Sequence, residues 1–172
     1  MAKLPILVAP DPRLKAKSRP VAKVDASVRR LMDDMLETMY AAPGIGLAAP
    51  QVGELTRVIV VDIAKDDEPK NPHLLANPEL VWVSDEDSSY EEGCLSVPEH
   101  YAEVTRPSRI RVRYLDRDNE MRELEAEGLL ATVIQHEMDH LEGILFIDYL
   151  TSLKRNMILR KLLKARKAEA VT

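Results

Sequence analysis

A single stretch of this chain, from Gly128 to Gly143, constrains the fold more than any other. Its apolar residues recur at three- and four-residue spacing, which predicts a helix with one buried face: Leu129, Leu130, Val133, Ile134, Met138 and Leu141. Gly143 is a natural end for that helix. The same stretch carries His136, Glu137 and His140 in a His-Glu-x-x-His pattern. The rest of the chain therefore has to fold around this helix.

Two histidines four residues apart on a helix project from the same face, so their imidazoles can converge on one metal ion. Glu137, one step round the helix, can reach a water molecule on that ion. A helical histidine is often only a hydrogen-bonded residue at the edge of the core, but the complete pattern favours a metal site. The pattern does not supply a third ligand, and the chemistry depends on that ligand.

Cys94 is the only thiol of the chain, and Gly93 before it permits a close approach. The local sequence leaves two interpretations open, a third metal ligand or a small buried apolar residue. Leu95 beside it offers a backbone N–H that can face an oxyanion, and Glu92 offers an anchoring carboxylate.

The length of 172 residues suits one domain, residues 1–172, with a sizeable core. Its net charge of −5 is unevenly distributed. From Thr151 to the end there are seven basic residues and one acidic residue, against 17 and 28 in the remainder. A basic helix at about 152–167 is therefore expected on an acidic body. Its basic face is either a solvated surface or a binding surface.

One cysteine cannot form an intramolecular disulfide, which favours a reducing compartment. No apolar run approaches the length of a membrane span. We expect a cytoplasmic protein with no membrane partner.

The remaining pattern predicts an irregular arm to Pro20, with a short helical turn after Asp11-Pro12, and a helix that begins at the N-cap Asp25 and ends before Pro43. A methionine-rich stripe on this helix is expected in the core, and Leu153, Met157, Ile158 and Leu162 are expected to form the apolar stripe of the last helix. The predicted strands are Arg57–Ile63, Glu79–Ser84, Ala102–Arg106, Arg109–Leu115 and Met121–Ala126. The predicted class is α+β, with mixed, mostly antiparallel sheets packed around the central His-Glu-x-x-His helix and with a C-terminal helix.

Gly44 to Gln51 is rich in small residues. It lacks the Gly-Lys-Ser/Thr ending of a Walker A loop and the preceding strand of a dinucleotide-binding loop. Small residues let another backbone approach closely, so an extended substrate can lie against this segment.

Three stretches, Gly44–Gln51, Glu92–Ser96 and Gln135–His140, resemble the three signature motifs of the peptide deformylases. They occur in the order and approximate spacing of that family. The similarity continues through the intervening strands to Leu145–Leu150 and so covers almost the whole chain.

This resemblance implies metal ligation by Cys94, His136 and His140, with water in the fourth position and Glu137 as general acid and base. It also implies that Gln51 and the backbone N–H of Leu95 hold the developing oxyanion. The family removes formate from the N-terminal formylmethionine of nascent peptides, usually with Fe²⁺, although Zn²⁺, Ni²⁺ or Co²⁺ can substitute. In similar deformylases a basic C-terminal helix contacts the ribosome, and no DNA partner is implied.

For the substrate, the resemblance implies strand-like pairing with the segment Gly44, Ile45 and Gly46, close to Glu92 and Gly93. The methionine pocket is expected to be lined by Ile45, Tyr90, Leu129, Thr132, Val133 and His136. Tyr101 stands where some members have an arginine, which leaves the preference beyond methionine open.

Two alternatives remain. A zinc endopeptidase can carry the same helix motif, but no helix with a matching third ligand is evident after His140. A ribosome-associated binding module with a structural metal is compatible with the basic helix, but it would not need Glu137 or Gln51.

Overall fold

The computed structural model describes residues 2–171, with side chains described through Ala168. The α+β prediction is confirmed. Within the described residues, a five-stranded sheet has the order β1-β2-β3-β6-β7, and β4 pairs with β5 in a separate two-stranded sheet; neighbours in both sheets are antiparallel. The strands are β1 (Gly46–Ala48), β2 (Val58–Val61), β3 (His73–Val83), β4 (Asp87–Cys94), β5 (Val97–Pro107), β6 (Arg109–Leu115) and β7 (Met121–Glu127), and the α-helices are α1 (Ala26–Ala41), α2 (Gly128–Leu141) and α3 (Ser152–Val171).

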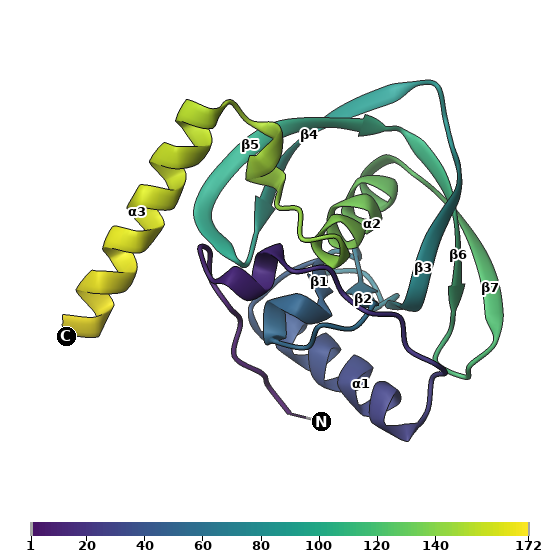
Figure 1. The fold of residues 1–172 in the computed structure, drawn as a ribbon. Coiled ribbons are helices and arrows are strands. Elements are labelled where there is room, and N and C mark those ends of the chain that lie inside the picture. Colours follow the sequence, from purple (N-terminus) through teal and green to yellow (C-terminus); the bar gives the residue numbers. More distant parts are fainter. Residues whose placement is uncertain (1, 172) are drawn as a thin grey trace.

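Helix α2 lies in the middle of the molecule, with β4 and β5 on one side and β3, β6 and β7 on the other (Figure 1). Its apolar face packs against β2, β3 and β6 in one cluster, which contains Ile59, Val61, Leu75, Ile110, Val112, Ala131, Val133, Ile134 and Leu141. The helix ends as predicted at Gly143, which has a φ of 75°. A Cβ there would lie 2.4 Å from the backbone oxygen of Lys15, so this position also requires a glycine for space.

Strand β2 is buried along its whole length because a helix covers each of its faces. Val58 and Val60 belong to the cluster of α1, whereas Ile59 and Val61 belong to the cluster of α2. The methionine stripe of α1 is in the core as predicted. The carboxylate of Asp25 caps this helix by accepting a hydrogen bond from the backbone of Val28 at 3.0 Å.

Four strands differ clearly from the prediction. Strand β1 was not predicted as a strand, and β5 begins at Val97 and not at Ala102. Strand β3 begins at His73 and not at Glu79, because a bulge accommodates Asn77 and Pro78 inside it. Asn77 has a φ of 48°, and its side chain bonds to the backbone N–H and C=O of Val21 in place of a neighbouring strand. The acidic stretch Asp85–Glu92 also contains most of β4, which the sequence did not predict as a strand.

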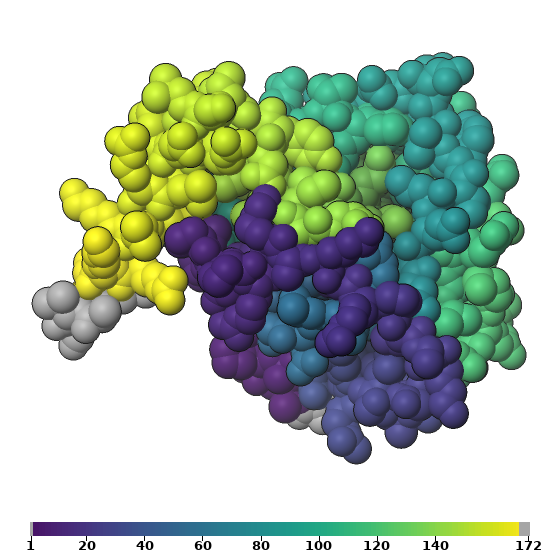
Figure 2. All heavy atoms as spheres, viewed as in Figure 1, coloured from purple at the N-terminus to yellow at the C-terminus, as the bar shows by residue number. Residues whose placement is uncertain are grey.

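The stripe predicted for α3 is only partly correct. Leu162 is buried and Ile158 is partly buried, but Leu153 is 69% exposed and Met157 is 47% exposed. Leu159 takes their place on the packing face. Helix α3 runs along one side of the body and extends beyond it (Figures 1 and 2). No helix within the described residues is long and apolar enough to cross a membrane.

The N-terminal arm contains the expected short helical turn, at Pro12–Lys15, and ties two of the motifs together. The backbone N–H of Leu7 donates to the carbonyl of Gln51 at 2.7 Å, and that of Ala9 donates to the carbonyl of Ser96 at 2.8 Å.

Candidate active site

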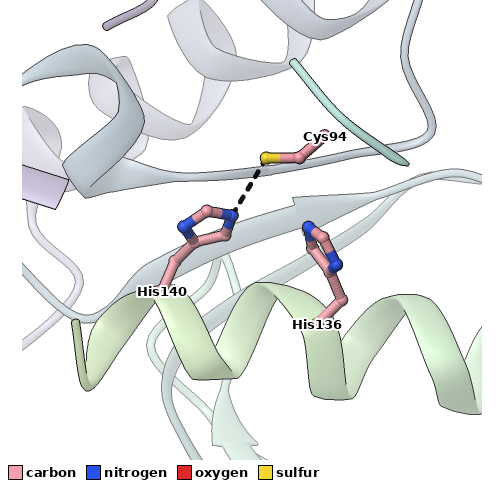
Figure 3. A group of neighbouring side chains, drawn as sticks. All are labelled: Cys94, His136 and His140. Atoms are coloured by element: carbon pink, nitrogen blue, oxygen red, sulfur yellow. Dashed lines mark hydrogen bonds between the residues drawn. The ribbon is translucent and has the colours of Figure 1, made fainter. Parts of the chain in front are cut away.

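Cys94, His136 and His140 come together between β4 and α2 (Figure 3). The helix places the two imidazoles one turn apart, with ring centroids 5.1 Å apart. Cys94, the last residue of β4, points its sulfur at them, 3.4 Å from Nε2 of His140. The three possible ligand atoms lie within 4.8 Å of one another. One sulfur and two imidazole nitrogens at this separation suit a divalent transition metal and leave a further coordination position open.

Glu92 anchors one of the imidazoles. Its Oε1 lies 2.9 Å from Nδ1 of His136, and a buried arginine, Arg106, bonds both carboxylate oxygens at 2.7 and 2.9 Å. Burial would raise the pKa of Glu92, but the hydrogen bonds from Arg106 and His136 outweigh it and hold that pKa below its usual value. An ionised Glu92 keeps the proton of His136 on Nδ1, so Nε2 is the nitrogen that can bind a metal.

Arg106 connects this anchor to a second carboxylate, that of Asp139 on α2. Its Nη1 donates to Asp139 at 2.8 Å, and the hydroxyl of Tyr149 donates to the same carboxylate oxygen at 2.7 Å. The guanidinium is thereby neutralised by two carboxylates, as a buried charge requires.

The two imidazoles stand in opposite electrostatic surroundings. Burial would lower the pKa of His136, but the charges of Glu137 and Cys94 and the bond to Glu92 raise it well above its usual value. Burial, followed by the positive charge of His136, lowers the pKa of His140. The field at His136 therefore favours a positive charge there.

Glu137 lies beside the two imidazoles without bonding to either. Its Oε2 is 4.0 Å from Nε2 of His136, and its Oε1 is 4.0 Å from Nε2 of His140. Oε1 is buried with no hydrogen-bond partner among the described residues. Burial raises the pKa of this carboxyl to about 7, so the group can exchange a proton near neutral pH.

Gly46 makes room for that carboxylate. A Cβ at this position would lie 2.4 Å from Oε2 of Glu137 and 2.9 Å from a methyl group of Val133. The small residue predicted to permit a close approach is thus packed directly against the metal-motif helix.

Gln51 is buried and its amide is oriented. Its Oε1 accepts the backbone N–H of Ala48 at 2.9 Å. Its Nε2 donates to the hydroxyl of Ser96 at 3.0 Å and lies 3.5 Å from the sulfur of Cys94. The donor end of the amide therefore faces the cluster of possible ligands.

A cavity of about 490 Å³ opens beside this cluster. Every residue predicted for the site lines it except His140, which is buried behind it. The lining includes Gly44, Ile45, Gly46, Gln51, Tyr90, Glu92, Gly93, Cys94, Leu95, Leu129, Thr132, Val133, His136 and Glu137. The carboxylate of Glu92 already accepts hydrogen bonds from His136 and Arg106. A substrate group could bond to it only in addition to these two partners.

Tyr101 lies at the rim of the cavity and is 66% exposed. Its ring covers Gly93, where a Cβ would lie 2.5 Å from a ring carbon. Strand β1, which also contributes to the cavity, is at the edge of its sheet, and one side of its backbone pairs with no other described strand.

Sequence reasoning missed Arg106 and Ser96. The sequence did contain a signal for Arg106. Side chains two residues apart on a strand lie on the same face, so Arg106 shares the inward face of Ala102 and Val104 on β5. Ser96 had no such signal, since its role depends on the distant Gln51.

Comparison with known proteins agrees with this geometry. The sequence model of the family described as Polypeptide deformylase matches residues 3–156. The chain belongs to the polypeptide deformylase family. It is 62% identical over 169 residues to a peptide deformylase of Methylocella silvestris, covering 96% of this chain and 86% of the relative.

Solved deformylase structures have the same fold. A peptide deformylase of Ehrlichia chaffeensis superposes with a TM-score of 0.94 at 40% identity, over 98% of this chain and 99% of that one. A structure of an Ehrlichia chaffeensis peptide deformylase in complex with actinonin gives a TM-score of 0.92 at 43% identity, over 96% and 98% of the two chains. This deformylase is thus a metal-dependent hydrolase that acts on N-formylmethionyl peptides, and the endopeptidase alternative is not supported.

Proposed function

We propose that this chain deformylates nascent peptides with Glu137, Gln51 and Leu95 acting around a metal ion held by Cys94, His136 and His140. The proposal rests on one observation, the meeting of a thiol and two imidazoles beside the buried carboxylate of Glu137, next to an open cavity. When bound, the metal ion supplies a Lewis acid that activates water and polarises the formyl carbonyl.

Residues of the chain transfer the proton and stabilise the oxyanion. Glu137 accepts a proton from the attacking water and delivers it to the departing amine. The amide of Gln51 and the backbone N–H of Leu95 donate hydrogen bonds to the oxyanion. Both donors are neutral, so they add no charge that would compete with the metal for its ligands.

The substrate backbone pairs with Gly44 and Ile45, which precede β1, and with Gly46 at the free edge of β1, with Gly93 on the opposite wall. The methionine side chain enters the pocket formed by Ile45, Tyr90, Leu129, Thr132 and Val133. This lining is mostly apolar, which suits an unbranched thioether. Backbone pairing recognises the length and direction of the substrate peptide but contacts few of its side chains. One enzyme can therefore process many different nascent chains.

For the metal we propose Fe²⁺, with Zn²⁺, Ni²⁺ or Co²⁺ as substitutes, because a ligand set of one sulfur and two nitrogens accepts all four and availability decides among them. Metal analysis of protein purified without oxygen tests this directly. Iron at less than one tenth of the bound metal would contradict it.

We further propose that residues 1–172 act as one catalytic domain in the cytoplasm and that the basic segment 152–167 makes a transient contact with the ribosome. The compartment is inferred from the single cysteine, a free thiol at the proposed metal site, because chains without disulfides are typical of reducing compartments. The ribosome contact is inferred from the exposed basic residues of α3.

The function is tested by following formate release and product masses with formyl-Met-Ala-Ser, acetyl-Met-Ala-Ser and an unblocked protein. Formyl presents only hydrogen where acetyl presents a methyl group, and a misplacement of about 1 Å costs on the order of 10²-fold in rate. We therefore expect a formyl preference of about that size. Protein carrying Glu137→Ala, purified in the same way, controls for a contaminating enzyme. Comparable rates with the two peptides, or cleavage of internal bonds, would refute the proposal.

A further inference from the structure

Ser96 is fully buried and bonded to two residues of the site, although the mechanism above gives it no part. Its hydroxyl accepts a hydrogen bond from Nε2 of Gln51, and its backbone N–H points at the sulfur of Cys94 from 3.4 Å. We propose that Ser96 is a positioning residue, whose hydroxyl holds the Gln51 amide so that one N–H is directed at the developing oxyanion. The inference rests on the proposed role of Gln51 as an oxyanion donor.

The hydrogen bonds of the Gln51 amide can be accounted for one by one. A primary amide has one carbonyl oxygen and two N–H donors. The oxygen is occupied by the backbone N–H of Ala48, which fixes the amide against a flip. One N–H is taken by the hydroxyl of Ser96. The other lies toward Cys94, at an N-to-S distance of 3.5 Å. Sulfur is a weaker acceptor than an oxyanion, so the substrate can take over this last N–H.

The Gln51 amide needs two hydrogen bonds to fix its orientation, because rotation about the last side-chain torsion of a glutamine costs little energy. The amide group rotates in a broad energy well, unlike the staggered torsions nearer the backbone. With Ala48 alone, the amide could pivot about that single hydrogen bond, and the free N–H would not keep its direction. The hydroxyl of Ser96 supplies the second anchor.

The N-terminal arm keeps the two partners at a constant distance. Leu7 holds the backbone carbonyl of Gln51, and Ala9 holds that of Ser96. Both side chains are buried, with 1% of Gln51 and none of Ser96 exposed, so water does not compete for the bond between them. A hydroxyl held in this way orients a donor before the substrate arrives, which is the condition for effective oxyanion stabilisation.

The test is a double-mutant cycle on the metal-loaded enzyme with formyl-Met-Ala-Ser. Gln51→Ala removes the donor and should lower kcat on the order of 10²-fold. Ser96→Ala should lower kcat about tenfold, with KM and metal content within about twofold of wild type, because it only misdirects the donor. When Ser96→Ala is added to Gln51→Ala, kcat should fall by less than about a further twofold, since Ser96 acts through Gln51. Ser96→Thr keeps the hydroxyl and should stay within about threefold of wild type.

A second measurement reports the amide itself. In ¹⁵N-labelled protein loaded with Zn²⁺, the side-chain N–H signals of Gln51 are identified by their loss in Gln51→Ala. In wild type the two signals should be widely separated, and in Ser96→Ala they should move toward the positions of a free glutamine amide. Ser96→Gly also lacks the hydroxyl and replaces Ser96→Ala in both measurements if the latter does not fold.

The inference is wrong if Ser96→Ala leaves kcat or the Gln51 signals unchanged. It is also wrong if this variant slows Gln51→Ala as much as it slows wild type, or if its activity falls only in proportion to its metal content. Failure of the proposed mechanism gives a different result, because Gln51→Ala would then retain nearly normal kcat. Failure of the proposed reaction would show as no release of formate by the wild-type enzyme.

Discussion

At the scale of single residues, the site keeps Glu137 close to the imidazoles of His136 and His140 but bonded to neither. Gly46 allows this arrangement, because any side chain there would collide with the carboxylate. A carboxylate held in this way cannot easily become a fourth protein ligand, and it stays available for proton transfer.

Replacing Glu137 by alanine should separate proton transfer from metal binding. We expect Glu137→Ala to keep stoichiometric metal and to lose about 10²- to 10⁴-fold in kcat, the usual range for a general base. Metal content is measured by elemental analysis on the same sample used for formate release. Loss of the metal, or nearly normal turnover, would mean that Glu137 has another role.

Glu92 should matter for metal affinity through His136, the imidazole that it anchors. Removing a carboxylate that orients a histidine ligand typically weakens metal binding about 10- to 100-fold. We expect this loss for Glu92→Ala, measured by competition for Zn²⁺ with a chelator. The neighbouring Glu91 is exposed and makes no ion pair among the described residues, so Glu91→Ala is the matched control. Equal affinities in the two variants would show that the anchor is dispensable.

The residues that come together here differ in how far the sequence revealed them. His136 and His140 are set by helical spacing, which is local information. Cys94 could be proposed because it is the only thiol of the chain. Arg106 and Ser96 act through Glu92 and Gln51, at 14 and 45 residues of separation, so only the folded chain defines their roles.

At the scale of elements, α2 and β2 were predictable from their hydrophobic patterns. The apolar residues of α2 recur at helical spacing, and β2 is a continuous apolar run that is buried on both faces. The start of β3 was not predictable, because Asn77 and Pro78 are residues typical of a turn. In the folded chain a bulge accommodates them inside the strand, and Asn77 bonds to Val21. Nor was β4 predictable, because its acidic residues have low strand propensity. Its pairing with β5 along almost its whole length overrides that propensity.

Strand β1 carries the element-scale prediction, because its free edge is the proposed site of backbone pairing with substrate. N-methylation of the peptide nitrogen that follows methionine in formyl-Met-Ala-Ser removes one donor from that pairing. A neutral hydrogen bond contributes about 0.5–1.5 kcal/mol, so kcat/KM should fall by about 2- to 12-fold.

Parent and test peptides are made as C-terminal amides, and the control peptide carries the methyl group on that terminal amide nitrogen, outside the short span of β1. It should react at nearly the rate of the parent peptide. An equal loss with both peptides would point to a general steric effect and against strand addition.

At the scale of the whole molecule, charge is separated between an acidic body and the basic helix α3. The packing face of α3 is apolar, with Leu162 buried and Ile158 and Leu159 partly buried. Arg160, Lys161 and Lys164 are exposed. None of the described residues of α3 lines the active-site cavity, so the proposed ribosome contact would use a different surface from substrate turnover.

Reversing the charge of these three residues should separate the two activities. In Arg160→Glu/Lys161→Glu/Lys164→Glu, we expect co-sedimentation with ribosomes to be lost while kcat/KM for a formyl tripeptide stays within about twofold of wild type, since distant independent sites do not couple. Wild-type binding should weaken steeply as salt rises, because contacts between cations and phosphates release counterions.

A matched control reverses three exposed basic residues elsewhere, Lys23, Arg30 and Lys65, and so changes the net charge by the same amount. If co-sedimentation depends on the position of the charges, this variant binds ribosomes almost as well as wild type. If both variants lose binding equally, net charge alone governs the interaction and α3 is not a docking element. If wild-type binding does not change with salt, the contact is not electrostatic, and the exposed Leu153 and Met157 become the side chains of α3 to replace next.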